Sequence, residues 1–123
     1  GSSGGSAAAL SAGATTLATG SDSTGSIRQP ASQCGVVGFQ ATHGRIPSIG
    51  SSSFDGYSKS GPMTRTVADC ALMTNVMSGP DYRDHNSLNN IDPITDCSAS
   101  ILFGISLEVF LTKFNWFTIL TFN

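Results

Sequence analysis

The stretch that decides the fold is GSDSTGSIRQPAS, residues 20–32, where small hydroxylated residues and glycines precede an arginine and a proline. Residues 17–22 predict a short buried strand that enters this turn, and TGSIRQPASQCG predicts a short helix after it, limited by Pro30. The first backbone N–H groups of such a helix have no intrahelical partner, so they can stabilise an oxyanion. The turn is therefore a candidate site.

Serine chemistry at this turn would centre on Ser26, just ahead of Ile27 and Arg28. A serine hydroxyl becomes a useful nucleophile when a base takes its proton and nearby donors stabilise the oxyanion. Gly25 would let a substrate carbonyl approach the backbone beside that hydroxyl. A serine-rich turn with an N-cap explains the same residues, and taken alone they favour that structural interpretation.

The rest of the chain predicts an α/β fold, a mixed sheet flanked by helices. Residues 5–18 are rich in Ala and Leu and predict a helix, and the β-branched and aromatic residues of 35–41 predict a buried strand. Residues 43–63 read as loop. A last helix is expected over residues 66–78, with Thr66 as its N-cap and Asp69 as its capping-box residue. Its apolar side is expected to comprise Val67, Ala71, Leu72, Met73 and Val76.

Composition excludes several classes of function. The chain has 123 residues, enough for one domain, and its 11% of charged residues suits the inner part of a larger protein. A net charge of −2 with six scattered basic residues argues against nucleic-acid binding. Three cysteines without a CxxC pattern predict neither a zinc site nor a disulfide framework, and favour a reducing, cytoplasmic setting. No carboxylate or cysteine stands at metal-ligand spacing from His43 or His85, so neither a metal nor another cofactor is expected.

The end of the chain differs from the rest, because residues 101–122 are strongly apolar and aromatic. Glu108 and Lys113 would be costly inside a bilayer, so buried strands are favoured over a membrane span. We expect residues 1–100 to form the central portion of one domain and 101–123 to be an apolar tail.

Two blocks of the sequence resemble the amidase signature family: residues 1–47, from GSSGG to GRIP, and residues 61–79, GPMTRTVADCALMTNVMSG. The resemblance implies hydrolysis of the C–N bond of a carboxamide through a serine acyl-enzyme. It places the nucleophile at Ser26 and a proton-relaying serine, preceded by a cis peptide bond, at Ser2. The tail resembles the family's following strand weakly, over residues 102–110, and truncation or a reading-frame error near its end is an alternative.

The same resemblance assigns further residues around Ser26. Asp22 and Arg28 occupy positions that brace the nucleophile's loop, while Thr24 stands where many relatives have glycine. We expect the hydroxyls of Ser2 and Ser26 to approach within hydrogen-bond distance. The backbone N–H groups that would form the oxyanion hole belong to Ser23, Thr24, Gly25 and Ser26.

The family's catalytic lysine lies upstream of the GSSGG block, and neither Lys59 nor Lys113 occupies its position. We therefore expect an internal piece of an amidase that is inactive by itself. The bond before Ser2 is expected to be trans or unresolved at this terminus, and cis in the complete enzyme.

Three functions remain open. A general amidase acting on a small carboxamide is favoured, because TVADCAL and GPDYRDHNSL are similar to stand-alone bacterial amidases. The glutamine-hydrolysing subunit of a tRNA-dependent amidotransferase is the second, since GSIRQPAS is similar to it, although Ser58 and Lys59 replace its usual Asp-Gln pair. A non-catalytic fragment is the third. No membrane or direct nucleic-acid partner is expected, and the oligomeric state is open.

Overall fold

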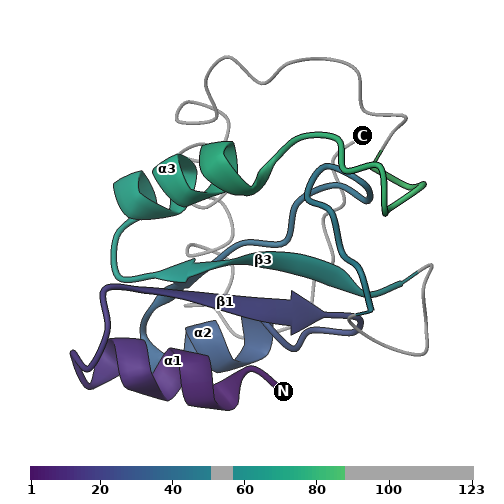
Figure 1. Cartoon of the computed structure of the whole chain (residues 1–123). Coiled ribbons are helices and arrows are strands. Elements are labelled where there is room, and N and C mark those ends of the chain that lie inside the picture. Colours follow the sequence, from purple (N-terminus) through teal and green to yellow (C-terminus); the bar gives the residue numbers. More distant parts are fainter. Residues whose placement is uncertain (51–56, 88–123) are drawn as a thin grey trace.

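The computed structural model describes residues 1–50 and 57–87 as a small sheet flanked by helices. In chain order the elements are α1 (Gly4–Ser11), β1 (Leu17–Asp22), α2 (Arg28–Cys34), β2 (Val37–Gly38), β3 (Lys59–Thr64) and α3 (Val67–Met77). Helices α1 and α2 cover one face of the sheet and α3 covers the other (Figure 1). The predicted α/β class, a sheet flanked by helices, is confirmed.

The sheet has the order β1-β3-β2, and both neighbouring pairs of strands are antiparallel. Its middle strand contains Pro62, which has no N–H to donate. The N–H of Phe39 donates to the carbonyl of Pro62 at 3.1 Å, so the backbone groups of Pro62 face β2 and the ladder with β1 stays intact. Strand β2 ends at Gly38, because continued pairing would need the missing N–H of Pro62.

The predicted strand over residues 17–22 is confirmed, but its predicted burial is wrong, since Asp22 alone of its residues is buried. The helix predicted over 5–18 ends at Ser11. Beyond it, the hydroxyl of Thr15 donates to the carbonyl of Leu17 at 2.8 Å, and pairing with β3 then extends the chain. The strand predicted over 35–41 is reduced to Val37–Gly38. The loop predicted over 43–63 is wrong at its end, where β3 begins at Lys59.

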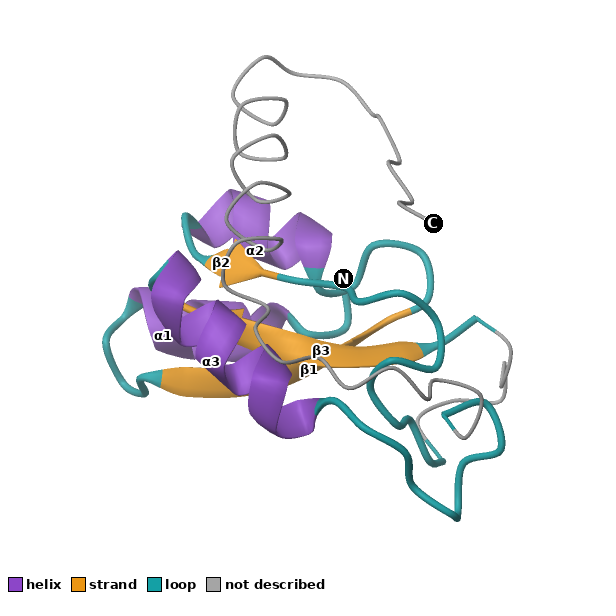
Figure 2. Cartoon of the chain, turned by 90° about the horizontal axis from the view of Figure 1, so that it is seen from above, coloured by secondary structure: helices purple, strands orange, loops and turns teal. Residues whose placement is uncertain are grey.

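Helix α3 lies over β3 when the molecule is viewed from above (Figure 2). The Thr66 hydroxyl accepts a hydrogen bond from the N–H of Asp69 at 3.1 Å, which confirms the predicted N-cap. The apolar side was only partly predicted. Cys70, Ala71 and Thr74 are buried, whereas Leu72 and Val76 are 65% and 80% exposed, since α3 meets the sheet with its other face.

Two clusters of buried residues hold the layers together. The larger lies between α1, α2 and the sheet, and the smaller lies beneath α3, where burial raises the pKa of the Cys70 thiol to about 11. That thiol is therefore a packing group at neutral pH. The larger cluster comprises Ala7, Leu10, Ile27, Ala31 and Met63.

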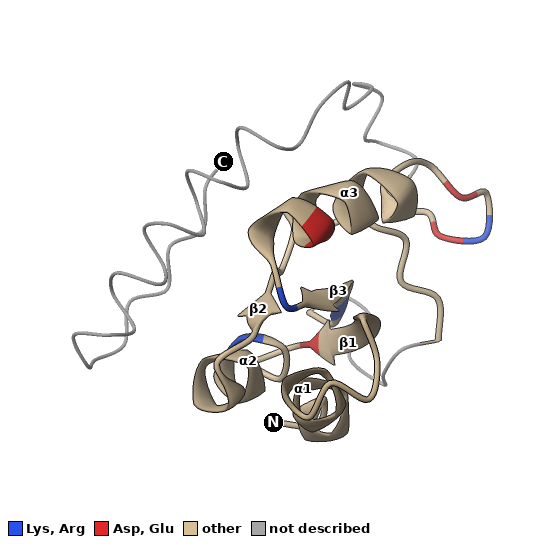
Figure 3. Ribbon diagram, turned by 90° about the vertical axis from the view of Figure 1, so that its left-hand side faces the viewer, with Lys and Arg blue, Asp and Glu red and all other residues tan. Residues whose placement is uncertain are grey.

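Charged residues are sparse on the ribbon, and one group of them lies in the loop after α3 (Figure 3). Within residues 1–50 and 57–87, no helix is long and apolar enough to cross a membrane. The predicted apolar tail, residues 101–123, lies outside the described residues.

Candidate active site

The turn between β1 and α2 is organised around the carboxylate of Asp22, the last residue of β1. Its two oxygens accept hydrogen bonds from the N–H groups of Gly25 at 2.6 Å, Ile27 at 3.1 Å and Arg28 at 3.2 Å. A carboxylate satisfies the unpaired N–H groups of a helix N-terminus and opposes its positive dipole end. One side chain therefore closes the turn and starts α2.

Two side-chain nitrogens of Arg28 donate hydrogen bonds to the same carboxylate. Its Nε lies 3.0 Å from Oδ2 and its Nη2 lies 3.1 Å from Oδ1 of Asp22, whose side chain is fully buried. Burial raises the pKa of Asp22, but the hydrogen bonds from Arg28 and from the backbone outweigh it, so the net shift is downward. The carboxylate is charged at neutral pH, and together with Arg28 it braces the turn.

The turn leaves backbone donors unused. Within residues 1–50 and 57–87, the N–H groups of Ser23, Thr24 and Ser26 donate no hydrogen bond, whereas the N–H of Gly25 is taken by Asp22. Gly25 has φ of +123°, a conformation that favours glycine. Three of the four predicted oxyanion donors are thus unpaired in this structure.

Ser26 lies against the N-terminal segment that carries Ser2. The N–H of Ser3 donates to the carbonyl of Ser26 at 3.3 Å. On the other side of Ser2, a Cβ added to Gly1 would lie only 2.5 Å from the Cα of Ser26. The two predicted catalytic serines therefore belong to segments in direct backbone contact, although they are distant in sequence. All peptide bonds in the described part of the chain are trans, the bond before Ser2 included.

An open groove of about 520 Å³ runs beside this contact. Hydroxyl groups dominate its lining, and Ser26 is not among the described residues that line it. Those residues are Ser2, Ser3, Ser6, Thr19, Gly20, Ser21, Pro47, Ser60 and Met77.

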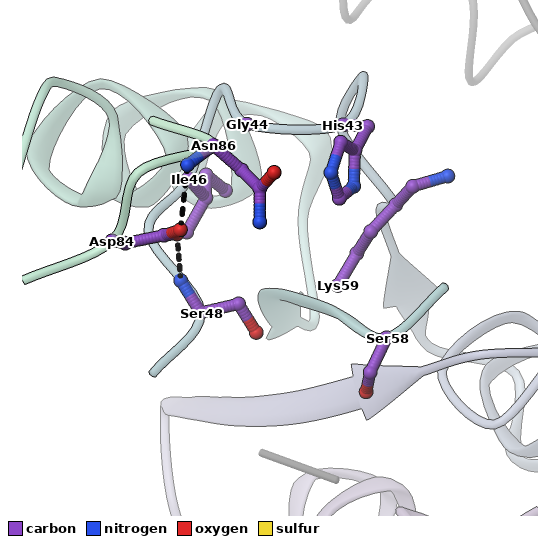
Figure 4. A pocket seen from close by; sticks show the side chains of 8 residues that line it. All are labelled: His43, Gly44, Ile46, Ser48, Ser58, Lys59, Asp84 and Asn86. Atoms are coloured by element: carbon purple, nitrogen blue, oxygen red, sulfur yellow. Dashed lines mark hydrogen bonds between the residues drawn. The ribbon is translucent and has the colours of Figure 1, made fainter. Parts of the chain in front are cut away.

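A second, much smaller pocket of about 10 Å³ contains none of the predicted catalytic residues. The carboxylate of Asp84 accepts hydrogen bonds there from the N–H groups of Ser48 at 2.9 Å and Asn86 at 3.0 Å (Figure 4). This volume holds about one water molecule. The pocket is therefore a junction between two loops, and His43 at its edge is exposed, as expected for a surface histidine.

Sequence reasoning did not single out two residues that contact the site. Ser3 exchanges hydrogen bonds with the backbone of Ser21, and the side-chain amide of Gln40 donates to the carbonyl of Asp22 at 3.1 Å. Ser3 could have been noticed only as the neighbour of Ser2. Nothing in the local sequence marks Gln40, because its partner lies 18 residues away, at the end of β1.

Comparison with known proteins gives independent evidence about the family of this chain. A family model described as Amidase matches residues 1–101. The chain is 52% identical over 93 residues to a subunit of the glutamyl-tRNA(Gln) amidotransferase of Burkholderia pseudomallei, covering 75% of the chain and 19% of that protein. It is 53% identical over 116 residues to the corresponding subunit from Desulforudis audaxviator, covering 89% and 24%. The chain thus spans about a fifth to a quarter of these relatives.

Solved structures of related proteins also resemble this chain in sequence and in fold. A bacterial aryl acylamidase of the amidase signature enzymes superposes with a TM-score of 0.66 at 45% identity, covering 77% of this chain and 20% of that one. The corresponding amidotransferase subunit from Thermotoga maritima gives a TM-score of 0.65 at 42% identity, covering 79% and 22%.

Proposed function

Because the chain belongs to the amidase signature family, we propose that it supplies the serine nucleophile of an amidase that hydrolyses a carboxamide through an acyl-enzyme. The observation that carries this is the contact of the Ser2 segment with Ser26 beside three unpaired backbone N–H groups. A nucleophile, a hydroxyl that can relay its proton and donors for an oxyanion are the parts that acyl transfer requires.

In the proposed reaction, Oγ of Ser26 attacks the amide carbon while its proton passes to the hydroxyl of Ser2. The N–H groups of Ser23, Thr24 and Ser26 stabilise the oxyanion; that of Gly25 can join them only by leaving Asp22. The C–N bond then breaks, the leaving nitrogen takes a proton back through Ser2, and an ester remains on Ser26. Water attacks this ester, which releases the carboxylic acid and restores the hydroxyl.

The base that drives the relay is a neutral lysine in the proposed mechanism, with a pKa lowered by burial. Lys59 opens β3 opposite Asp22, and it makes no hydrogen bond to Ser2 or Ser26 within the described residues. We place the base outside these 123 residues, so the chain alone is inactive. A small carboxamide substrate and a cytoplasmic location are parts of the same proposal.

The experiment measures ammonia release from simple carboxamides by the 123-residue chain, and by the same chain extended with the upstream segment of the Burkholderia pseudomallei relative. We expect turnover only from the extended protein, and its Ser26→Ala variant should retain at most the residual catalysis of binding and oxyanion stabilisation, ~10³–10⁴-fold over water. Ser32→Ala, which alters an exposed serine of α2, is the matched control. Turnover by the short chain that Ser26→Ala removes would show that a base lies within these residues.

A second candidate, glutamine hydrolysis for a tRNA-dependent amidotransferase, is favoured because the sequence relatives described above are subunits of glutamyl-tRNA(Gln) amidotransferases. Ser58 and Lys59 still replace the Asp-Gln pair that the resemblance to this subunit implies there, and Ser58 is buried. The same assay with L-glutamine as substrate separates the two. Preference for glutamine over simple carboxamides would select the amidotransferase function.

A further inference from the structure

The outer edge of β1 is closed by hydroxyl side chains. Thr19 stands opposite Pro62, so it and every second residue of β1 direct their backbone groups away from β3. Unpaired groups at a sheet edge invite pairing with another strand unless something covers them. Each of the three outward carbonyls accepts a hydrogen bond from a hydroxyl: that of Leu17 from Thr15 at 2.8 Å, that of Thr19 from Ser6 at 2.9 Å and that of Ser21 from Ser3 at 3.3 Å.

Ser3 differs from Ser6 and Thr15 because its hydroxyl both donates a hydrogen bond to β1 and accepts one from it. Its Oγ donates to the carbonyl of Ser21 and accepts from the N–H of Ser21 at 3.1 Å. Ser3 is only 8% exposed, and a Cβ added to Gly20 would lie 2.8 Å from its Oγ. The side chain is therefore wedged against β1 just before the nucleophile turn.

The backbone of Ser3 makes the second connection, to Ser26. Its N–H donates to the carbonyl of Ser26, and the N–H of Gly4 donates to the carbonyl of Gly1 at 3.1 Å. Ser2 lies inside the turn that this last bond closes, with Ser3 attached directly to it. Fixing Ser3 on Ser21 consequently fixes the peptide that carries the Ser2 hydroxyl relative to Ser26.

We propose that Ser3 is a positioning residue, which holds Ser2 in register with Ser26 by fastening the N-terminal segment to β1. The inference rests on the proposed function, since it concerns the relay between those two serines. Proton relay requires hydroxyls at about 2.6–3.2 Å, and a displacement of about 1 Å can cost ~10²-fold in rate. Loss of the Ser3 hydroxyl should therefore act on the chemical step.

The kinetic test compares Ser3→Ala with Thr15→Val in the extended amidase described above. Both changes remove one hydroxyl that binds the outer edge of β1, but only Ser3 is also hydrogen-bonded to Ser26. We expect Ser3→Ala to lower kcat about 10- to 100-fold with KM within about twofold. Thr15→Val should change neither by more than about twofold. Equal kcat values for the two variants would overturn the proposal.

A second measurement needs no activity and uses the 123-residue chain. Amide hydrogen exchange at Ser21 should accelerate about tenfold or more in Ser3→Ala, because its acceptor is lost, and the amide resonance of Ser26 should shift. Thr15→Val should leave both unchanged. An unchanged Ser26 resonance in Ser3→Ala would refute the positioning role. Activity that survives Ser26→Ala would instead refute the proposed function, and the exchange data would still decide how Ser3 acts on Ser26.

Discussion

Two aspartate–arginine pairs of the same chemistry occupy opposite environments in this molecule. Asp22 and Arg28 lie at the turn between β1 and α2, where the Asp22 side chain is 0% exposed and the Arg28 side chain 29%. Asp81 and Arg83 lie in the loop after α3, with 21% and 60% exposed. The exposed pair has the shorter contact, 2.6 Å against 3.0 Å. Distance alone therefore does not rank them.

What separates the pairs is the set of other groups that depend on each carboxylate. The carboxylate of Asp22 accepts hydrogen bonds from three backbone N–H groups, those of Gly25, Ile27 and Arg28, besides the Arg28 guanidinium. The carboxylate of Asp81 accepts only from Arg83 within the described residues, through the backbone N–H and the guanidinium of that residue. Exposed ion pairs are screened by water and contribute little, whereas a buried carboxylate cannot be removed without leaving donors unpaired. Burial and connectivity decide the contribution.

The largest effect is expected from Asp22→Asn, which keeps the shape but removes the charge and one acceptor oxygen. We expect the free energy of unfolding to fall by about 3–5 kcal/mol, the usual cost of breaking a buried ion pair. Much of a small domain's stability would be lost. Urea unfolding followed by circular dichroism measures this change. A loss below about 1 kcal/mol would show that the turn does not depend on this carboxylate.

A smaller effect is expected from acid in the unchanged chain. The pKa of Asp22 is lowered in the folded state, so its contribution to stability is present above its ordinary pKa of 3.8 and is lost as pH falls through the folded value. The free energy of unfolding should therefore fall more steeply below about pH 4 in the unchanged chain than in Asp22→Asn. Urea unfolding at a series of pH values tests this. Parallel curves would mean that Asp22 titrates alike in both states.

The smallest effect is expected from Asp81→Asn. Arg83 lowers the pKa of Asp81 to about 2, yet both groups are open to solvent. We expect an unchanged urea midpoint within experimental error, at low and at high salt alike. A decrease comparable with that of Asp22→Asn would remove the distinction between the pairs.

Local sequence signals predicted the starts of the elements well. Thr66 with Asp69 marks the beginning of α3, and the turn around Gly25 marks the beginning of α2. Pro30 lies in the first turn of α2, where its missing N–H costs no helical bond. These signals depend on neighbours within a few residues, so they can be read without a tertiary structure.

Pairing between distant segments was harder to predict from the sequence. The residues of β3 include Gly61 and Pro62, which suggest a loop, and they form the middle strand only because β1 and β2 lie on both sides. The exposed positions of Leu72 and Val76 follow from the face that α3 turns toward the sheet. An apolar side chain indicates a preference for burial, but the partner surface decides whether the preference is met.

The sequence by itself determined the family, and the resemblance to that family indicated the candidate serines and the residues expected to brace their turn, because a family is recognised from the order of residue types along the chain. Only the tertiary structure decided that the segment of Ser2 touches Ser26, that Ser3 fastens it to β1, and that the N–H of Gly25 is occupied by Asp22. Each of these is a contact of about 3 Å, and hydrogen bonds weaken steeply beyond that distance. Such contacts arise from how the strands and helices pack, which no local pattern specifies.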